Sequence, residues 1–119
     1  MLARLYRLKK RKDFSRLLKN GKAKTTKFLS IKFIDNNQET SRFGFLAGKK
    51  TFKKASLRNK IKRRLRQALK ENLFLIEPGK DIVFFARTGF EDRSAIEAKE
   101  EIAYLLKMAN LIKKQQTPQ

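Results

Sequence analysis

The sequence has no cysteine and no histidine, and only two prolines and five glycines among its 119 residues. It can therefore form no disulfide, and it offers neither a thiolate nor an imidazole as nucleophile, general base or metal ligand. Serine–histidine and cysteine–histidine catalysis are excluded. No apolar run approaches the ~20 residues of a membrane span, and no signal peptide precedes the first basic run. We expect one domain of a cytoplasmic protein.

Acidic residues are scarce as well. The chain carries 31 Lys and Arg against 11 Asp and Glu, a net charge of +20. Residues 1–70 hold 24 basic and 3 acidic residues, whereas residues 71–119 hold 7 and 8. Such a concentration of one sign suits a polyanionic partner. A disordered basic tail on a small domain would give the same charge, but the apolar periodicity of the basic half and the ten Phe favour a folded chain.

Hydrophobic periodicity predicts elements in the order α-β-β-α-β-α, an α/β two-layer sandwich with a small sheet, formed by a single domain over residues 1–119. Gly21 is expected to end the first helix in a left-handed conformation, Ser56 to cap the second, and Ser94 with Glu97 to form a capping box on the third. We expect a hairpin between the first two strands. The expected segments are a basic arm over 1–11 that orders only on its partner, helix 12–20, strands 23–34 and 42–48, helix 56–76, strand 81–87, a helix to about 113, and a frayed tail over 114–119.

The predicted helix 56–76 has a basic flank without acidic neighbours. Arg58, Lys62 and Arg66 recur every four residues beside the apolar stripe, and no acid occurs between Glu39 and Glu71. Like charges four residues apart repel, so a merely solvated helix usually interleaves Glu with Lys. Guanidinium groups fit phosphates bidentately, and the flank is better explained as a row of phosphate contacts to nucleic acid.

RNA is the expected nucleic acid. The sequence shows no helix-turn-helix spacing and no dimer zipper of the kinds that read DNA. A small sheet rich in Phe, a basic helix and a basic arm suit shaped or single-stranded RNA, although Phe in such a domain more often belongs to the core.

A central motif carries a family resemblance. It consists of Gly44, Lys49-Lys50, Ala55, Arg58-Asn59-Lys60-Ile61-Lys62-Arg63 and Leu65-Arg66. Lys12-Asp13-Phe14, Gly21, Phe28 and Asp81-Ile82-Val83-x-x-Ala86-Arg87 agree with it. With these residues the chain resembles the protein subunit of bacterial ribonuclease P over most of its length. Lys60 stands where the family more often has Arg, and Ile31 where it often has an aromatic ring.

The resemblance implies both a fold and a function. It implies a left-handed βαβ crossover, which is rare among parallel connections. It further implies that a large RNA with bound Mg²⁺ cleaves precursor tRNA, with the Mg²⁺ held mainly by that RNA, and we expect no catalytic residue in the protein. The protein would hold the single-stranded 5′ leader of the precursor in a cleft between the sheet and the first helix.

Two sets of site residues follow from the resemblance. The leader cleft would comprise Phe14, Leu18, Phe28, Ile31 and Phe33. For Phe14, a purely structural role in the core is an equal alternative. The face toward the catalytic RNA would comprise Lys49, Lys50, Lys53, Lys54, Arg58, Asn59, Lys60, Lys62, Arg63 and Arg66.

Two other functions compete with this prediction. An autonomous nuclease would need a cluster of carboxylates for metal ions, but Asp13, Asp35 and Glu39 are the only acids before Glu71 and fall in separate elements. A small ribosomal protein would use the same electrostatics, and only the central motif disfavours it.

Overall fold

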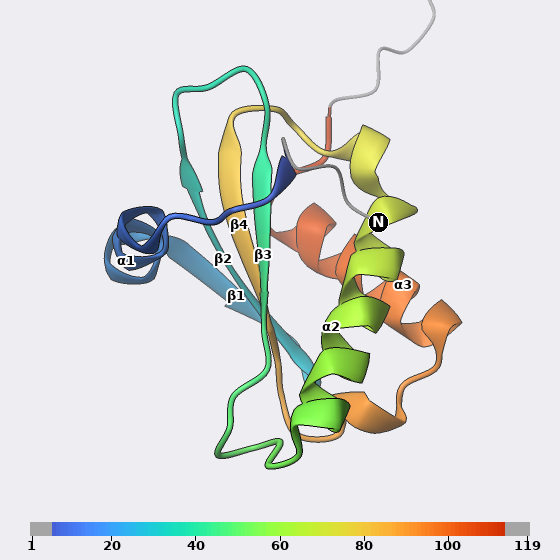
Figure 1. Cartoon of the computed structure of the whole chain (residues 1–119). Coiled ribbons are helices and arrows are strands. Elements are labelled where there is room, and N and C mark those ends of the chain that lie inside the picture. The colour runs from blue at the N-terminus through green and yellow to red at the C-terminus, as the bar shows by residue number, and fades with distance from the viewer. Residues whose placement is uncertain (1–5, 114–119) are drawn as a thin grey trace, which may run out of the picture.

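The computed structural model describes residues 6–113, which form three α-helices and one four-stranded sheet (Figure 1). Two short 3₁₀ turns, Leu73–Leu75 and Phe90–Asp92, follow α2 and β4. The elements in chain order are α1 (Arg11–Asn20), β1 (Lys22–Thr25), β2 (Leu29–Asp35), β3 (Arg42–Leu46), α2 (Ala55–Lys70), β4 (Lys80–Ala86) and α3 (Ala95–Met108).

The strands lie in the order β1-β2-β4-β3. β4 pairs antiparallel with β2 and parallel with β3, so the hairpin expected between β2 and β3 is wrong. β4 takes the central place because its side chains at residues 81–84 are buried on both faces, as a continuous apolar run requires. The β3–α2–β4 connection joins adjacent parallel strands, and its left-handed sense stays a prediction of the resemblance.

Alternation along the strands separates two apolar faces. One face, with Ile31, Phe43 and Phe84, packs against α2 and α3 and holds the main core. The other, with Val83, packs against Leu17 of α1 in a smaller cluster. Figure 1 shows α1 on one side of the sheet and both other helices on the opposite side. The α/β class is confirmed, and α1 adds a partial third layer to the two that were predicted.

α2 differs from its prediction at both ends. It begins at Ala55 with Lys54 in the N-cap position, and no side chain caps it, so the expected cap at Ser56 is wrong. It ends at Lys70 instead of residue 76, because the buried amide of Asn72 donates to the carbonyl oxygen of Ala68 at 3.0 Å and satisfies one of the free carbonyls of the last turn.

The capping box of α3 is confirmed. The hydroxyl of Ser94 accepts a hydrogen bond from the Glu97 amide at 3.1 Å, and the Glu97 carboxylate accepts from the Ser94 amide at 3.0 Å. The helix ends at Met108, five residues before the predicted end. Asn110 then adopts a left-handed conformation with φ of 59°, and Ile112 forms a bridge with Ile76.

Three predictions in the first third of the chain need correction. Residues 6–10 of the predicted arm are ordered without a partner. Leu8 is buried, and its amide donates to the carbonyl oxygen of Phe43 at 2.8 Å. Gly21 has φ of −73° and is not left-handed; a Cβ there would collide with the carbonyl oxygen of Leu17. The single strand expected over 23–34 is two strands, β1 and β2. Residues 1–5 of the predicted arm and the predicted tail, 114–119, lie outside the described residues.

Candidate nucleic-acid interface

A cleft of about 500 Å³ opens between α1, β3 and α2. It brings together two predicted site residues that are far apart in the sequence, Phe14 of α1 and Arg66 of α2. The guanidinium carbon of Arg66 lies 5.7 Å from the ring centroid of Phe45 on β3, a cation–π geometry. The cleft is lined by Arg7, Leu8, Lys9, Phe14, Phe43, Gly44, Phe45 and Arg66.

Phe14 reaches the sheet where β3 has no side chain. A Cβ on Gly44 would lie 2.8 Å from Cε1 and 2.9 Å from Cζ of the Phe14 ring. The ring is half-buried and packs beside the small cluster of Leu8, Leu17 and Val83. Phe14 therefore packs against the sheet while it also lines the cleft, and its role toward the leader stays a prediction beside the purely structural one.

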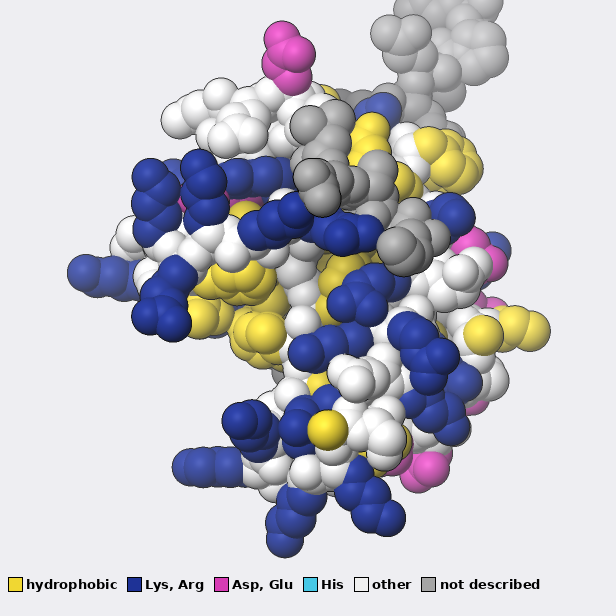
Figure 2. Space-filling view, viewed as in Figure 1, with side chains coloured by type: hydrophobic (Ala, Val, Ile, Leu, Met, Phe, Trp, Pro, Cys, Tyr) yellow, Lys and Arg dark blue, Asp and Glu magenta, His cyan; other side chains and the backbone are white. Residues whose placement is uncertain are grey.

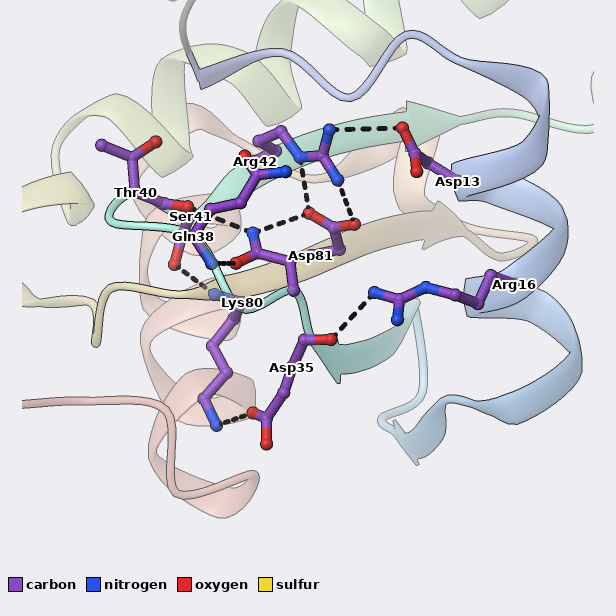
Figure 3. A network of polar contacts seen from close by, with 10 residues as sticks. Asp13, Arg16, Asp35, Gln38, Thr40, Ser41, Arg42, Lys80 and Asp81 are labelled. Atoms are coloured by element: carbon purple, nitrogen blue, oxygen red, sulfur yellow. Dashed lines mark hydrogen bonds and ion pairs between the residues drawn. The ribbon is translucent and has the colours of Figure 1, made fainter.

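Polar contacts hold α1 against the strands (Figure 3). Arg42 at the start of β3 donates to both carboxylate oxygens of the fully buried Asp81, at 2.9 and 2.7 Å, and to the carboxylate of Asp13 on α1 at 3.2 Å. The hydrogen bond to Asp81 raises the pKa of the Arg42 guanidinium, against the opposing effect of its burial. Arg16 of α1 donates to the carbonyl oxygen of Asp35 at 2.8 Å.

The predicted leader-cleft residues do not share one surface. Phe14 and Leu18 lie on α1, and Leu18 is 42% exposed. Ile31 is fully buried beneath α2 and α3, so its assignment to the cleft is wrong, and Phe33 packs against the same core. Phe28 lies beside the end of β4, with the Arg93 guanidinium carbon 4.5 Å from its ring centroid. The resemblance placed residue 31 by motif, whereas the strand's alternation turns it to the other face.

Two residues that the sequence analysis missed continue the face below α1. Leu46 and Phe85 are register partners on β3 and β4, both half-buried, and pack against the small cluster with Phe14. The neighbouring strand presents Lys32, whose ammonium donates to the carbonyl oxygen of Leu18 at 2.9 Å. Figure 2 shows an apolar hollow below α1, with Lys and Arg side chains above and below it. Strand alternation was the available signal, since Lys32 and Ile34 lie on the face that Ile31 does not share.

The residues predicted to face the catalytic RNA lie at the surface but on two sides of α2. The four loop lysines, together with Asn59, Lys60, Arg63 and Arg66, are exposed, and Lys62 is half-exposed. Arg66 lines the cleft, whereas Lys60 and Arg63 line a second groove between α2 and α3. The loop lysines are Lys49, Lys50, Lys53 and Lys54.

Arg58 differs from its predicted neighbours because its guanidinium is already engaged. It donates to the carbonyl oxygens of Phe52 and Lys53 at 2.8 and 2.9 Å. Phe52 is buried, so Arg58 ties the lysine-rich loop to the first turn of α2. Both bonds come from one terminal nitrogen, Nη1, so Arg58 supports the loop, and its contact to phosphate stays a prediction.

Residues 6–113 contain neither a metal-binding group of carboxylates nor a helix that could span a membrane. No group of three or more Asp or Glu side chains in this part of the chain could hold a metal ion. None of its helices is long and apolar enough to cross a bilayer.

Comparison with known proteins agrees with the geometry. Residues 2–110 match the family model described as Ribonuclease P. The ribonuclease P protein component of Pelotomaculum thermopropionicum is 36% identical over 104 residues, which cover 87% of this chain and 92% of that protein. That of Bacillus velezensis is 35% identical over 109 residues, covering 91% and 92%.

Solved structures show the same fold. The RNase P protein of Staphylococcus aureus superposes with a TM-score of 0.80 at 31% identity, covering 91% of this chain and 98% of that one. The RNase P protein of Thermotoga maritima gives a TM-score of 0.77 at 31% identity, covering 86% and 96%. With an apolar cleft, a basic helix and a lysine-rich loop in this arrangement, and with these relatives, the chain belongs to the ribonuclease P protein family.

Proposed function

We propose that the chain binds the catalytic RNA of ribonuclease P through α2 and the lysine-rich loop, and binds the 5′ leader of precursor tRNA in the cleft beside α1. The single observation that supports this is the junction of the two surfaces. Arg66 of α2 and Phe14 of α1 line the same cleft, so one RNA bound on α2 and a second strand under α1 would lie in contact. An RNA-binding protein with only one surface would not need this junction.

The cleft suits a single strand better than a duplex. The cleft is lined by the rings of Phe14 and Phe45 and by the cations Lys9 and Arg66. Aromatic rings beside cations are the elements of single-strand binding, in which bases stack and phosphates pair with Lys and Arg.

The hydrolytic step belongs to the RNA partner in this proposal. Residues 6–113 bring no group of three or more carboxylates together that could hold a metal ion, and in this proposal the ions that activate water would be held by the catalytic RNA. The protein contributes position and charge. Its cations screen repulsion between two RNAs, and it should therefore lower the Mg²⁺ concentration that the reaction needs.

Reconstitution tests the proposal. Cleavage of precursor tRNA is measured with the chain alone, with the ribonuclease P RNA from the same genome alone, and with both, over a titration of Mg²⁺. We expect no cleavage by the chain alone, weak cleavage by the RNA at low Mg²⁺, and strong cleavage by the pair. Cleavage by the chain alone would indicate an autonomous nuclease, and superimposable Mg²⁺ curves with and without protein would contradict the proposal.

A further inference from the structure

α1 is a basic helix that lies against a basic protein. It carries four cations and one acid, and among its residues only Leu17 is fully buried. Apolar packing therefore holds α1 weakly, and charge repulsion opposes its docking. Its one acid, Asp13, offsets part of this repulsion through an ion pair with Arg42.

Arg42 connects Asp13 to the centre of the sheet. One edge of its guanidinium grips both oxygens of Asp81, and its remaining terminal nitrogen reaches Asp13. Asp81 is fully buried, and it accepts a further hydrogen bond from the Asn36 amide at 3.0 Å. The two hydrogen bonds to Asp81 therefore hold the Arg42 side chain in place. Its remaining nitrogen, Nη1, binds Asp13 and so attaches α1 to the sheet.

The same turn of α1 carries the aromatic contact. Phe14 follows Asp13 directly, and its ring occupies the space above Gly44, two residues beyond Arg42 on β3. Leu18 lies one turn further along α1, where Lys32 holds its carbonyl oxygen. An ion pair and a ring contact at adjacent positions together determine how α1 is rotated and how far it stands from the sheet.

We propose that Arg42, with Asp81 behind it, is a positioning residue that holds α1 through Asp13 and so sets the geometry of the leader cleft. This inference rests on the proposed function, because the leader is the ligand whose binding it controls. Arg42 itself does not contact the leader. It acts by placing the Phe14 ring in the wall of the cleft, against Gly44 of β3.

Asp13→Asn is the test variant because it removes the charge of the pair while it keeps the shape of the side chain and the Asp81–Arg42 contact. Asp35→Asn is a matched control with the same change of charge and atoms. The Asp35 side chain is 73% exposed and pairs with Lys80. Its contact to Arg16 uses the backbone carbonyl, which the substitution leaves intact.

The measurement is the affinity of each reconstituted holoenzyme for precursor tRNA and for the same tRNA without its leader, at a temperature well below melting. For Asp13→Asn we expect affinity for the leader-bearing tRNA to fall about tenfold, the scale of one charged hydrogen bond. Affinity for the leaderless tRNA and for the catalytic RNA should stay within about twofold. Asp35→Asn should leave all three unchanged.

A double-mutant cycle adds a second readout. In the Arg42→Lys background, which keeps the charge and loses the guanidinium fork, Asp13→Asn should have a smaller effect than in the wild type. A full tenfold loss in both backgrounds would overturn the inference, as would an equal fall in leader-bearing and leaderless affinity. If the wild-type holoenzyme itself shows no preference for the leader, the proposed function fails instead.

Discussion

The ring of Phe14 lies in the space that a side chain on Gly44 would fill, with two ring carbons within 2.9 Å of the position of a Cβ atom. Gly44→Ala should therefore push the ring and α1 outward. Overpacking of this kind costs about 1–3 kcal/mol of unfolding free energy, and leader-dependent affinity should fall with it. Gly48→Ala is the control, because no atom lies within 4 Å of its Cβ position. Equal melting temperatures for the two variants would contradict the contact.

Phe14→Ala separates the two roles of the ring. Phe14 is half-buried, so we expect a loss of stability well below the ~3–5 kcal/mol of a fully buried Phe. Loss of a stacked base should cost about 1–3 kcal/mol in affinity for leader-bearing precursor tRNA. Melting temperature, affinity for the catalytic RNA and affinity for precursor with and without leader are measured on one sample. A steep fall in melting with equal losses in all affinities would make Phe14 a core residue only.

Arg58 and Arg66 should behave differently although both belong to the same motif. Arg66→Ala should remove one phosphate contact, weaken assembly with the catalytic RNA and lower the salt slope by about one unit. Arg58→Ala should release the loop of residues 49–54, whose carbonyls it holds. Limited trypsin digestion of the free protein measures this release: cleavage after the loop lysines should accelerate in Arg58→Ala and not in Arg66→Ala. Identical digestion patterns for the two variants would contradict the role of Arg58 in holding the loop and would favour a direct contact to phosphate.

Anions should stabilise the free protein. The first 70 residues carry a net charge of +21, and an anion that binds the native state both relieves repulsion and shifts the folding equilibrium by mass action. The melting temperature should rise with phosphate or sulfate above its value in chloride at the same ionic strength. A midpoint that does not depend on the anion would refute this.

The capping box of α3 should weaken in acid. Hydrogen bonds from Ser94 hold the pKa of the Glu97 carboxyl below its ordinary value. A depressed carboxyl pKa contributes stability that is complete above the unfolded value, about 4.3, and is lost as pH falls through the folded value. Glu97→Gln should thus melt below the wild type at pH 7, and the difference should disappear in acid. Ser94→Ala should cost about 1 kcal/mol.

Local patterns in the sequence predicted those helices and helix caps that depend on residues close together in the chain. The period of Phe14, Leu17 and Leu18 identifies α1, and Ser94 with Glu97 identifies the start of α3. The end of α2 could not be predicted, because it depends on a single hydrogen bond from Asn72 to a carbonyl. The spacing of the apolar residues, which includes Leu73, instead predicts a helix that continues to residue 76.

Strand order and strand faces depend on distant partners and were harder to predict. The apolar run of residues 81–87 is typical of a fully buried strand and does not by itself give its neighbours, and the shortest connection favoured a hairpin between the first two strands. The family motif suggested a cleft position for Ile31, whereas pairing with Phe84 places it toward α2 and α3. The tether from Arg42 to Asp13 joins α1 to β3, and no pattern in the sequence links them.

The central position of β4 has a consequence for synthesis on the ribosome. The strand that joins β2 to β3 is the last of the four to be made, so neither neighbour can complete its backbone pairing until translation has passed Ala86. Until then a nascent chain with almost all of the protein's excess positive charge emerges beside ribosomal RNA without a closed sheet. The strand order thus delays formation of the complete sheet until after the basic residues 1–70 have been made. Only when β4 pairs with β2 and β3 do these residues form a folded RNA-binding surface.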